Sequence, residues 1–181
     1  MADPDPDPDP DPGAAPPPLF PYVGPPGPAA LARPGVRGRA VRGPRDLDPL
    51  PGDPGEPCTY VVDREGVLRI APRRSEHVVC AGGEPVRAAG EMGFRRTATG
   101  SWTVDSVSNL STGYCPDLTA WRAVAAALDR AGTDRPEGFT HAVVFRRCES
   151  CRECNVVRED WYVCALCDAE LPPEWNVGHG S

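Results

Sequence analysis

The sequence predicts an α+β protein in which one helix covers a small antiparallel β-sheet, preceded by a disordered tail and followed by a four-cysteine hairpin. Three observations lead to this prediction. The first 57 residues hold 18 of the 24 prolines. Short runs of β-branched and aromatic residues, separated by turn residues, follow from residue 58. Two C-x-x-C motifs lie beyond residue 147. We therefore expect three parts, at 1–57, 58–147 and 148–181.

Residues 1–57 are expected to be disordered. Residues 3–12 are five Asp-Pro repeats, in which proline removes the backbone donor and neighbouring aspartates repel one another, so an extended chain is favoured. Residues 13–57 remain rich in Pro and Gly and offer few apolar side chains to offset the entropy lost on ordering. The folded part should therefore begin near Cys58.

Five short segments carry the features of β-strands. Apolar and β-branched residues dominate them, and turn pairs such as Gly82-Gly83 and Thr99-Gly100 separate them. The segments are 59–62, 67–70, 77–81, 85–94 and 102–107. Because the connections are short, we expect an antiparallel meander.

One helix follows a polar loop at 108–116. Asp117 or Thr119 can cap its N-terminus, and Gly132 stands where a glycine commonly ends a helix. The apolar stripe that should cover the open face of the sheet consists of Leu118, Trp121, Val124, Ala125 and Leu128. A final strand at 139–145 then leads directly into the first cysteine motif.

The charge pattern argues against nonspecific nucleic-acid binding. The formal net charge is -7, and all 19 basic residues are arginine, so no lysine side chain is present for Schiff-base chemistry. Binding to phosphates requires a basic face, whereas the arginines near the cysteines alternate with acidic residues. The alternating residues are Arg146, Arg147, Arg152, Arg158, Glu149, Glu153, Glu159 and Asp160.

The sequence also predicts a cytoplasmic protein without a membrane partner. No apolar run reaches the length of a membrane span. The N-terminus lacks the basic start and the apolar stretch of a secretory signal. We therefore expect the eight cysteines to be reduced unless they bind a metal.

The cysteine motifs predict a closed metal site. Two C-x-x-C turns separated by twelve residues supply four thiolates, the ligand set of a structural Zn²⁺ ion, and leave no position for a substrate or an activated water. The insert predicts a zinc-ribbon hairpin, with strands at 155–157 and 161–163 and a turn at 158–160. The predicted ligands are Cys148, Cys151, Cys164 and Cys167.

Alternatives to this ligand set remain open. Cys154 forms an overlapping C-x-x-C motif with Cys151, so these two residues could be the first pair. A disulfide-linked tail or an iron–sulfur cluster would use the same thiols. Trp175, which follows the second motif, is expected to fold back over the ribbon as an apolar lid.

A second group of candidate residues could form the pocket of an enzyme or an effector-related domain. Its members are His77, Glu91, Asn109, Ser111 and Tyr114. If Glu91 faces inward it needs a partner, for which Arg87 or His77 is available. Cys115 could act as a nucleophile beside His77 or His141. Each of these residues also has a structural interpretation, and convergence into one concave pocket would distinguish the two.

The same stretch carries a resemblance to a known module. The residues concerned are His77, Gly82-Gly83, Ala88-Ala89-Gly90-Glu91, Asn109, Ser111-Thr112-Gly113-Tyr114 and Pro116. This pattern resembles a module of plant IQ-motif calmodulin-binding proteins, which is also similar to segments of polymorphic-toxin-like proteins. The module usually has Ser-Gly-His-Tyr at the position of residues 111–114, and the IQ motif itself is absent, so calmodulin binding is not implied here. Together with the cysteine ribbon, the chain is similar to small uncharacterised actinobacterial proteins, which implies no activity.

The sequence as a whole favours a non-enzymatic zinc-binding protein. One structural Zn²⁺ ion would stabilise the C-terminal end, and the ribbon or the sheet would supply a surface that binds another protein. An enzyme with the pocket described above is the alternative.

Overall fold

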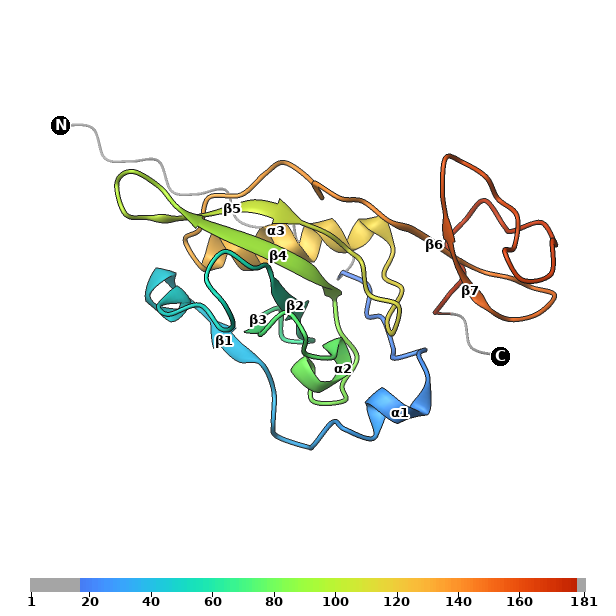
Figure 1. Ribbon diagram of the computed structural model, residues 1–181, viewed down its shortest axis with the longest axis horizontal. Coiled ribbons are helices and arrows are strands. Elements are labelled where there is room, and N and C mark those ends of the chain that lie inside the picture. The colour runs from blue at the N-terminus through green and yellow to red at the C-terminus, as the bar shows by residue number, and fades with distance from the viewer. Residues whose placement is uncertain (1–16, 179–181) are drawn as a thin grey trace.

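The computed structural model describes residues 17–178, so the Asp-Pro repeats lie outside the described part of the chain. Two antiparallel sheets are present in this range, one with the strand order β1-β3-β2-β4-β5 and a smaller one formed by β6 and β7 at one end of the molecule (Figure 1). Their bounds are β1 Arg39–Val41, β2 Cys58–Val62, β3 Leu68–Ala71, β4 Ala88–Arg96, β5 Trp102–Val107, β6 Val144–Arg147 and β7 Cys154–Val157. No helix within residues 17–178 is long and apolar enough to cross a membrane.

Helix α3 (Trp121–Arg130) covers one face of the larger sheet, as predicted. It contacts β2, β3 and β4 and buries Val124 and Leu128 against them. Its start follows the prediction too, because the carboxylate of Asp117 accepts the N–H of Thr119 at 3.2 Å, at the beginning of the short 3-10 helix η2 (Leu118–Ala120). The chain is therefore α+β, with a mostly antiparallel sheet and few helices.

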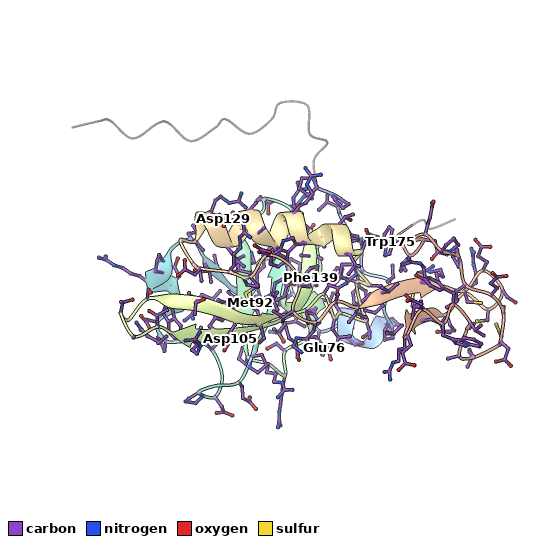
Figure 2. The ribbon with its side chains drawn as sticks, turned by 90° about the horizontal axis from the view of Figure 1, so that it is seen from above. Glu76, Met92, Asp105, Asp129, Phe139 and Trp175 are labelled. Atoms are coloured by element: carbon purple, nitrogen blue, oxygen red, sulfur yellow. The ribbon has the colours of Figure 1, made fainter. Side chains whose placement is uncertain are left out.

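The segment predicted as a strand at 77–81 forms the short helix α2 (His77–Cys80) instead. The carbonyl of Glu76 accepts the N–H groups of both Val79 and Cys80, at 3.1 and 3.0 Å. Strand β2 already pairs with β3 on one side and β4 on the other, so no place beside it remains for a further strand. In Figure 2, Glu76 lies on the side of the sheet opposite α3.

Residues 17–57 are part of the fold, so the prediction of disorder up to residue 57 is wrong for them. Phe20 exchanges two backbone hydrogen bonds with Val86, at 2.7 and 3.0 Å. Strand β1 extends the sheet by pairing with β3. Phe20, Val41 and Leu47 are buried in the main core. Two short helices complete the segment, α1 (Pro26–Ala29) and η1 (Pro44–Leu47).

In the segment that links the two sheets, the strand is shorter than predicted. Residues 139–145 were expected to form one strand, but β6 begins only at Val144. Before it, Thr140 ties the chain to the end of β5, donating its N–H to the carbonyl of Val107 at 2.9 Å and accepting the N–H of Val107 at its hydroxyl at 2.8 Å. One backbone bond and one side-chain bond thus stand here in place of a regular ladder.

Trp175 packs on the main body and not over the cysteine motifs, so the predicted lid is misplaced. Its ring lies edge-on to Phe20, with centroids 5.3 Å apart. Its indole N–H donates to the carbonyl of Cys115 at 2.9 Å. Figure 2 labels Trp175 at the junction between the helix-covered sheet and the cysteine end. Nearby, Val177 is buried together with Phe145, so the C-terminal segment fastens the two sheets to each other.

The placement of Phe20 gives a testable prediction. Phe20→Ala removes a fully buried ring that contacts Trp175, and the cavity it leaves should lower the free energy of unfolding by about 3–5 kcal/mol. Chemical denaturation followed by circular dichroism measures this change. The matched control is Leu31→Ala, at a residue that is 63% exposed and should change stability by less than about 0.5 kcal/mol. Equal stability of both variants would show that the segment does not belong to the core.

Candidate metal centre

Four cysteine side chains converge at the end of the molecule that carries β6 and β7. Their Sγ atoms all lie within 4.8 Å of one another. Two of the approaches run between the two motifs, with Cys148 Sγ 3.6 Å from Cys167 Sγ and Cys151 Sγ 3.6 Å from Cys164 Sγ. None of the four is in a disulfide. The cluster could therefore hold a metal ion between the two motifs, with the ligands predicted from their spacing.

The two C-x-x-C motifs fold into equivalent turns. In the first, the N–H of Arg152 donates to the carbonyl of Cys148 at 2.9 Å, and in the second the N–H of Asp168 donates to the carbonyl of Cys164 at 3.0 Å. Arg152 and Asp168 also share a positive φ, 69° and 58°. Because both turns curl in the same way around their sulfurs, they face each other as two halves of one site.

Asn155 joins the two turns, a role that the sequence did not reveal. Its side-chain oxygen accepts the N–H of Ala165 at 3.0 Å, and its amide donates to the carbonyl of Glu153 at 3.0 Å and to Cys164 Sγ at 3.5 Å. Asn155 is buried, so these bonds are shielded from water. Its only sequence signal is a polar residue among the apolar positions of a predicted strand.

Backbone donors favour the thiolate form at two of the cysteines. The N–H groups of Cys151 and Ser150 lower the pKa of Cys148. The N–H of Leu166, whose nitrogen lies 3.5 Å from Cys164 Sγ, lowers the pKa of Cys164 to about 6. At Cys151 the N–H of Glu153 acts in the same direction, but burial and the neighbouring thiols raise its pKa to about 12. Because three other sulfurs lie close to Cys151 Sγ, they disfavour a negative charge on it. A bound cation would relieve this repulsion.

The hairpin itself is built differently from the prediction. Strand β7 pairs with β6, with Val157 opposite Val144, and not with a strand at 161–163. Residues 158–160 do form the expected turn, in which the N–H of Trp161 donates to the carbonyl of Arg158 at 2.9 Å. Beyond it, Val163 makes only an isolated bridge to Glu170.

Cys154, the alternative ligand, faces away from the four-cysteine cluster. Successive side chains of a strand point to opposite sides. In β7 the side chains of Asn155 and Val157 pack toward the cysteine turns. Cys154 therefore points to the other side, where it packs with Cys115 and Phe145.

His77 and Glu91 have structural partners. The Nε2 of His77 lies 2.9 Å from the carbonyl oxygen of Gly90, and burial lowers the pKa of His77, so a neutral ring donates this bond. Gly90 is required at its position, because a Cβ there would lie 2.1 Å from the carbonyl oxygen of Ser108. Glu91 pairs with Arg73 at 3.8 Å, and not with Arg87 or His77, the two partners considered from the sequence.

The polar side-chain atoms of Asn109 and Tyr114 also form hydrogen bonds with the backbone. Asn109 donates to the carbonyl of Val143 at 2.7 Å and accepts the N–H of the same residue at 2.7 Å. The hydroxyl of Tyr114 donates to the carbonyl of Glu84 at 2.8 Å. Ser111 is buried and accepts the N–H of Cys115 at its carbonyl, at 2.7 Å.

These contacts give no support to the predicted catalytic pocket. The polar atoms of His77, Asn109 and Tyr114 are bound to four different backbone carbonyls, where they hold the chain in place. Glu91 and His141 do border a cavity of about 300 Å³. The thiol of Cys115 lies beside another cysteine, Cys154, and not beside the histidine that a nucleophile would use.

Comparison of the chain with models of protein families, with curated proteins and with solved structures finds no match in any of the three. The resemblance of the stretch between His77 and Pro116 to the module of IQ-motif proteins thus stays a prediction. Function must be argued from the geometry of the cysteine cluster, which is the only group of three or more potential metal ligands found within residues 17–178.

The bridging role of Asn155 leads to a prediction. Asn155→Ala removes the bonds to Ala165 and to Cys164 Sγ, so the second turn loses its tie to β7. Metal affinity should fall by about 10- to 100-fold, the usual effect of losing a residue that orients a ligand. Competition with a chromophoric chelator measures this ratio. As a control, Asn176→Ala removes bonds to the backbone of Arg147 only and should leave the affinity unchanged. An equal loss in both variants would contradict a specific role of Asn155.

Proposed function

We propose that this protein is a non-enzymatic zinc-binding protein, in which one structural Zn²⁺ ion supports a surface that binds another protein. The observation that carries the proposal is the spacing of the four sulfurs. A tetrahedral Zn²⁺ ion with bonds of about 2.3 Å has edges of about 3.8 Å, close to the 3.6 Å between the sulfurs of Cys148 and Cys167 and between those of Cys151 and Cys164.

The same spacing argues against the other uses of these thiols. In a disulfide the sulfurs would be about 2.05 Å apart. A cluster of four irons binds each cysteine to a different iron, which spreads the sulfurs further than a single ion does. With four protein ligands on one ion, no coordination position is left for a substrate. A structural role for the ion follows from this complete set of protein ligands.

The cysteine end also offers apolar side chains to a partner. Trp161 is 70% exposed and Leu166 is 71% exposed. Trp161 follows a turn in which Glu159 and Asp160 both have a positive φ, 50° and 56°, a conformation that Asp adopts in such turns but Glu rarely does. A strained turn that presents a tryptophan to solvent is typical of binding sites, where aromatic residues supply much of the affinity.

The metal site and this surface are linked through the chain. Leu166 lies between Cys164 and Cys167, and its N–H bonds to Cys164 Sγ, so its position depends on the second cysteine turn. Trp161 lies three residues before Cys164. We infer that a bound ion fixes both side chains, and that the partner protein offers an apolar pocket to them.

Zinc binding is tested on protein purified without added metal. We expect one zinc per chain, and four thiols that react only after a strong chelator is added. Cys164→Ser should lose the ion and the thermal stability of the C-terminal end, because structural zinc contributes on the order of 10 kcal/mol to folding. The control Cys58→Ser, at a buried cysteine of the larger sheet, should keep its zinc. Full zinc content in Cys164→Ser would overturn the assignment.

Protein binding is tested by photo-cross-linking in cells. A photoreactive residue at position 166 should yield one discrete adduct with another protein, and the same residue at position 99, in the exposed β4–β5 hairpin, should not. The adduct should disappear when Cys164→Ser is added, since the surface then loses its support. As a further control, cross-linking of the purified chain alone identifies the adducts that form between copies of this protein. The same adducts from positions 166 and 99 would contradict a binding surface at the cysteine end.

A further inference from the structure

Two further cysteines meet on the side of β7 that faces away from the metal cluster. Cys154 begins β7, and Cys115 lies in the loop between β5 and α3, yet the two pack against each other and line one cavity. Neither is in a disulfide. Cys115 is 1% exposed, whereas Cys154 is partly exposed. The pair thus consists of an accessible thiol backed by a buried one.

The backbone holds Cys115 firmly in this position. Its N–H donates to the carbonyl of Ser111 at 2.7 Å, and its own carbonyl accepts the indole N–H of Trp175 at 2.9 Å. Its φ of 44° is unusual for a residue other than glycine. Fixed on both sides, Cys115 is held where its side chain packs against Cys154 and its thiol donates to the carbonyl of Thr112 at 3.3 Å.

Arg147 and a cavity lie next to the Cys115–Cys154 pair. Arg147 lies opposite Cys154 in the β6–β7 ladder, and its Nη2 lies 4.0 Å from Cys154 Sγ. Its Nε is buried and has no hydrogen-bond partner within residues 17–178. A cavity of about 570 Å³ is lined by both thiols, Arg147 and Arg152. Positive charge beside a thiol in an open cavity is the environment of a reactive cysteine.

The electrostatics match this geometry. The neighbouring Cys115 thiol, followed by the charge of Arg147, lowers the pKa of Cys154 to about 6, against the opposing effects of burial and of Glu153. The neighbouring Cys154, together with burial, raises the pKa of Cys115. Near neutral pH the thiolate form is therefore favoured at Cys154, whereas Cys115 remains a thiol whose S–H donates to the carbonyl of Thr112 at 3.3 Å.

We propose that Cys154 and Cys115 form a peroxide-reactive dithiol site, in which Cys154 is the attacking residue and Cys115 the resolving residue. The proposal is independent of which ion the four other cysteines bind. Hydrogen peroxide or a small organic hydroperoxide would enter through the cavity between Arg147 and the two thiols.

The reaction takes place in two balanced steps. The Cys154 thiolate attacks one peroxide oxygen, so an S–O bond forms, the O–O bond breaks, and the leaving hydroxide or alkoxide takes up a proton from solvent. Cys154 is then a sulfenic acid, oxidised by two electrons, and the peroxide is reduced. The Cys115 thiol attacks the sulfenic sulfur, forming the disulfide and releasing water. A thiol such as glutathione restores both residues by exchange.

Two other cysteines of this chain provide an internal control for the reactivity of Cys154. Cys58 and Cys80 are also buried and reduced, but burial raises their pKa values, to about 11 and about 12. They lie in the larger sheet and in α2, away from the pair. A general sensitivity of all thiols would affect these two as well, whereas the proposed site would react alone.

The first test uses the unaltered chain with its metal bound. Cys154 should be alkylated by iodoacetamide at least about 10-fold faster than Cys58 and Cys80 at neutral pH, and its rate should rise with pH around a midpoint near 6. Treatment with hydrogen peroxide should produce a disulfide between Cys115 and Cys154, located by peptide mass spectrometry, while the ion stays bound. Oxidation that begins at the four metal-binding cysteines and releases the ion would overturn the proposal, as would alkylation of Cys154 at the rate of Cys58.

Two variants separate the roles of the pair. Cys115→Ser keeps a hydroxyl that can donate to the carbonyl of Thr112 but cannot form a disulfide, so peroxide should leave a sulfenic acid at Cys154 that dimedone traps. Cys154→Ser should make Cys115 resistant to peroxide. Thermal melting of both variants checks that they fold. Oxidation of Cys115 at an unchanged rate in Cys154→Ser would show that Cys154 is not the attacking residue.

Discussion

The C-terminal end of this protein depends on bringing four sulfurs to one point. Its own core is small: the buried side chains there are Cys148, Val157, Cys164 and Leu171, two of them cysteines of the cluster. So few apolar groups cannot offset the entropy of ordering about thirty residues. A cation that bound all four thiolates would supply the missing free energy and remove the repulsion among them. The equivalent turns, the β6–β7 pairing and the bonds of Asn155 all serve this arrangement.

The cysteine end is fastened to the main body by a few specific contacts. Asn109 binds the backbone just before β6, and Trp175 binds both Phe20 and the carbonyl of Cys115. Asn176 bonds to both the N–H and the carbonyl of Arg147. As a result, β7 is shared between two sites. One of its sides, with Asn155 and Val157, supports the four-cysteine cluster, and the other places Cys154 against Cys115.

The parts of the fold that the sequence predicts well are those set by local rules. The strands at 59–62, 67–70 and 102–107 and the helix capped by Asp117 follow from alternation, turns and caps. The four-cysteine cluster follows from spacing alone, since a C-x-x-C turn brings its two sulfurs together wherever it occurs.

The remaining features depend on long-range contacts. Composition suggested disorder up to residue 57, but a few apolar side chains such as Phe20 and Leu47 are enough to anchor that segment once a core exists to receive them. Val78 and Val79 form too short an apolar run to distinguish strand from helix. The role of Asn155 and the meeting of Cys115 with Cys154 depend on the register of β6 and β7, which the sequence does not specify.

The most direct test of the central claim is X-ray absorption at the zinc K-edge on protein purified without added metal. We expect one zinc per chain with four sulfur neighbours at about 2.3 Å and no nitrogen or oxygen neighbour. A first shell that contains nitrogen or oxygen, or fewer than four sulfurs, would contradict a closed site formed by Cys148, Cys151, Cys164 and Cys167.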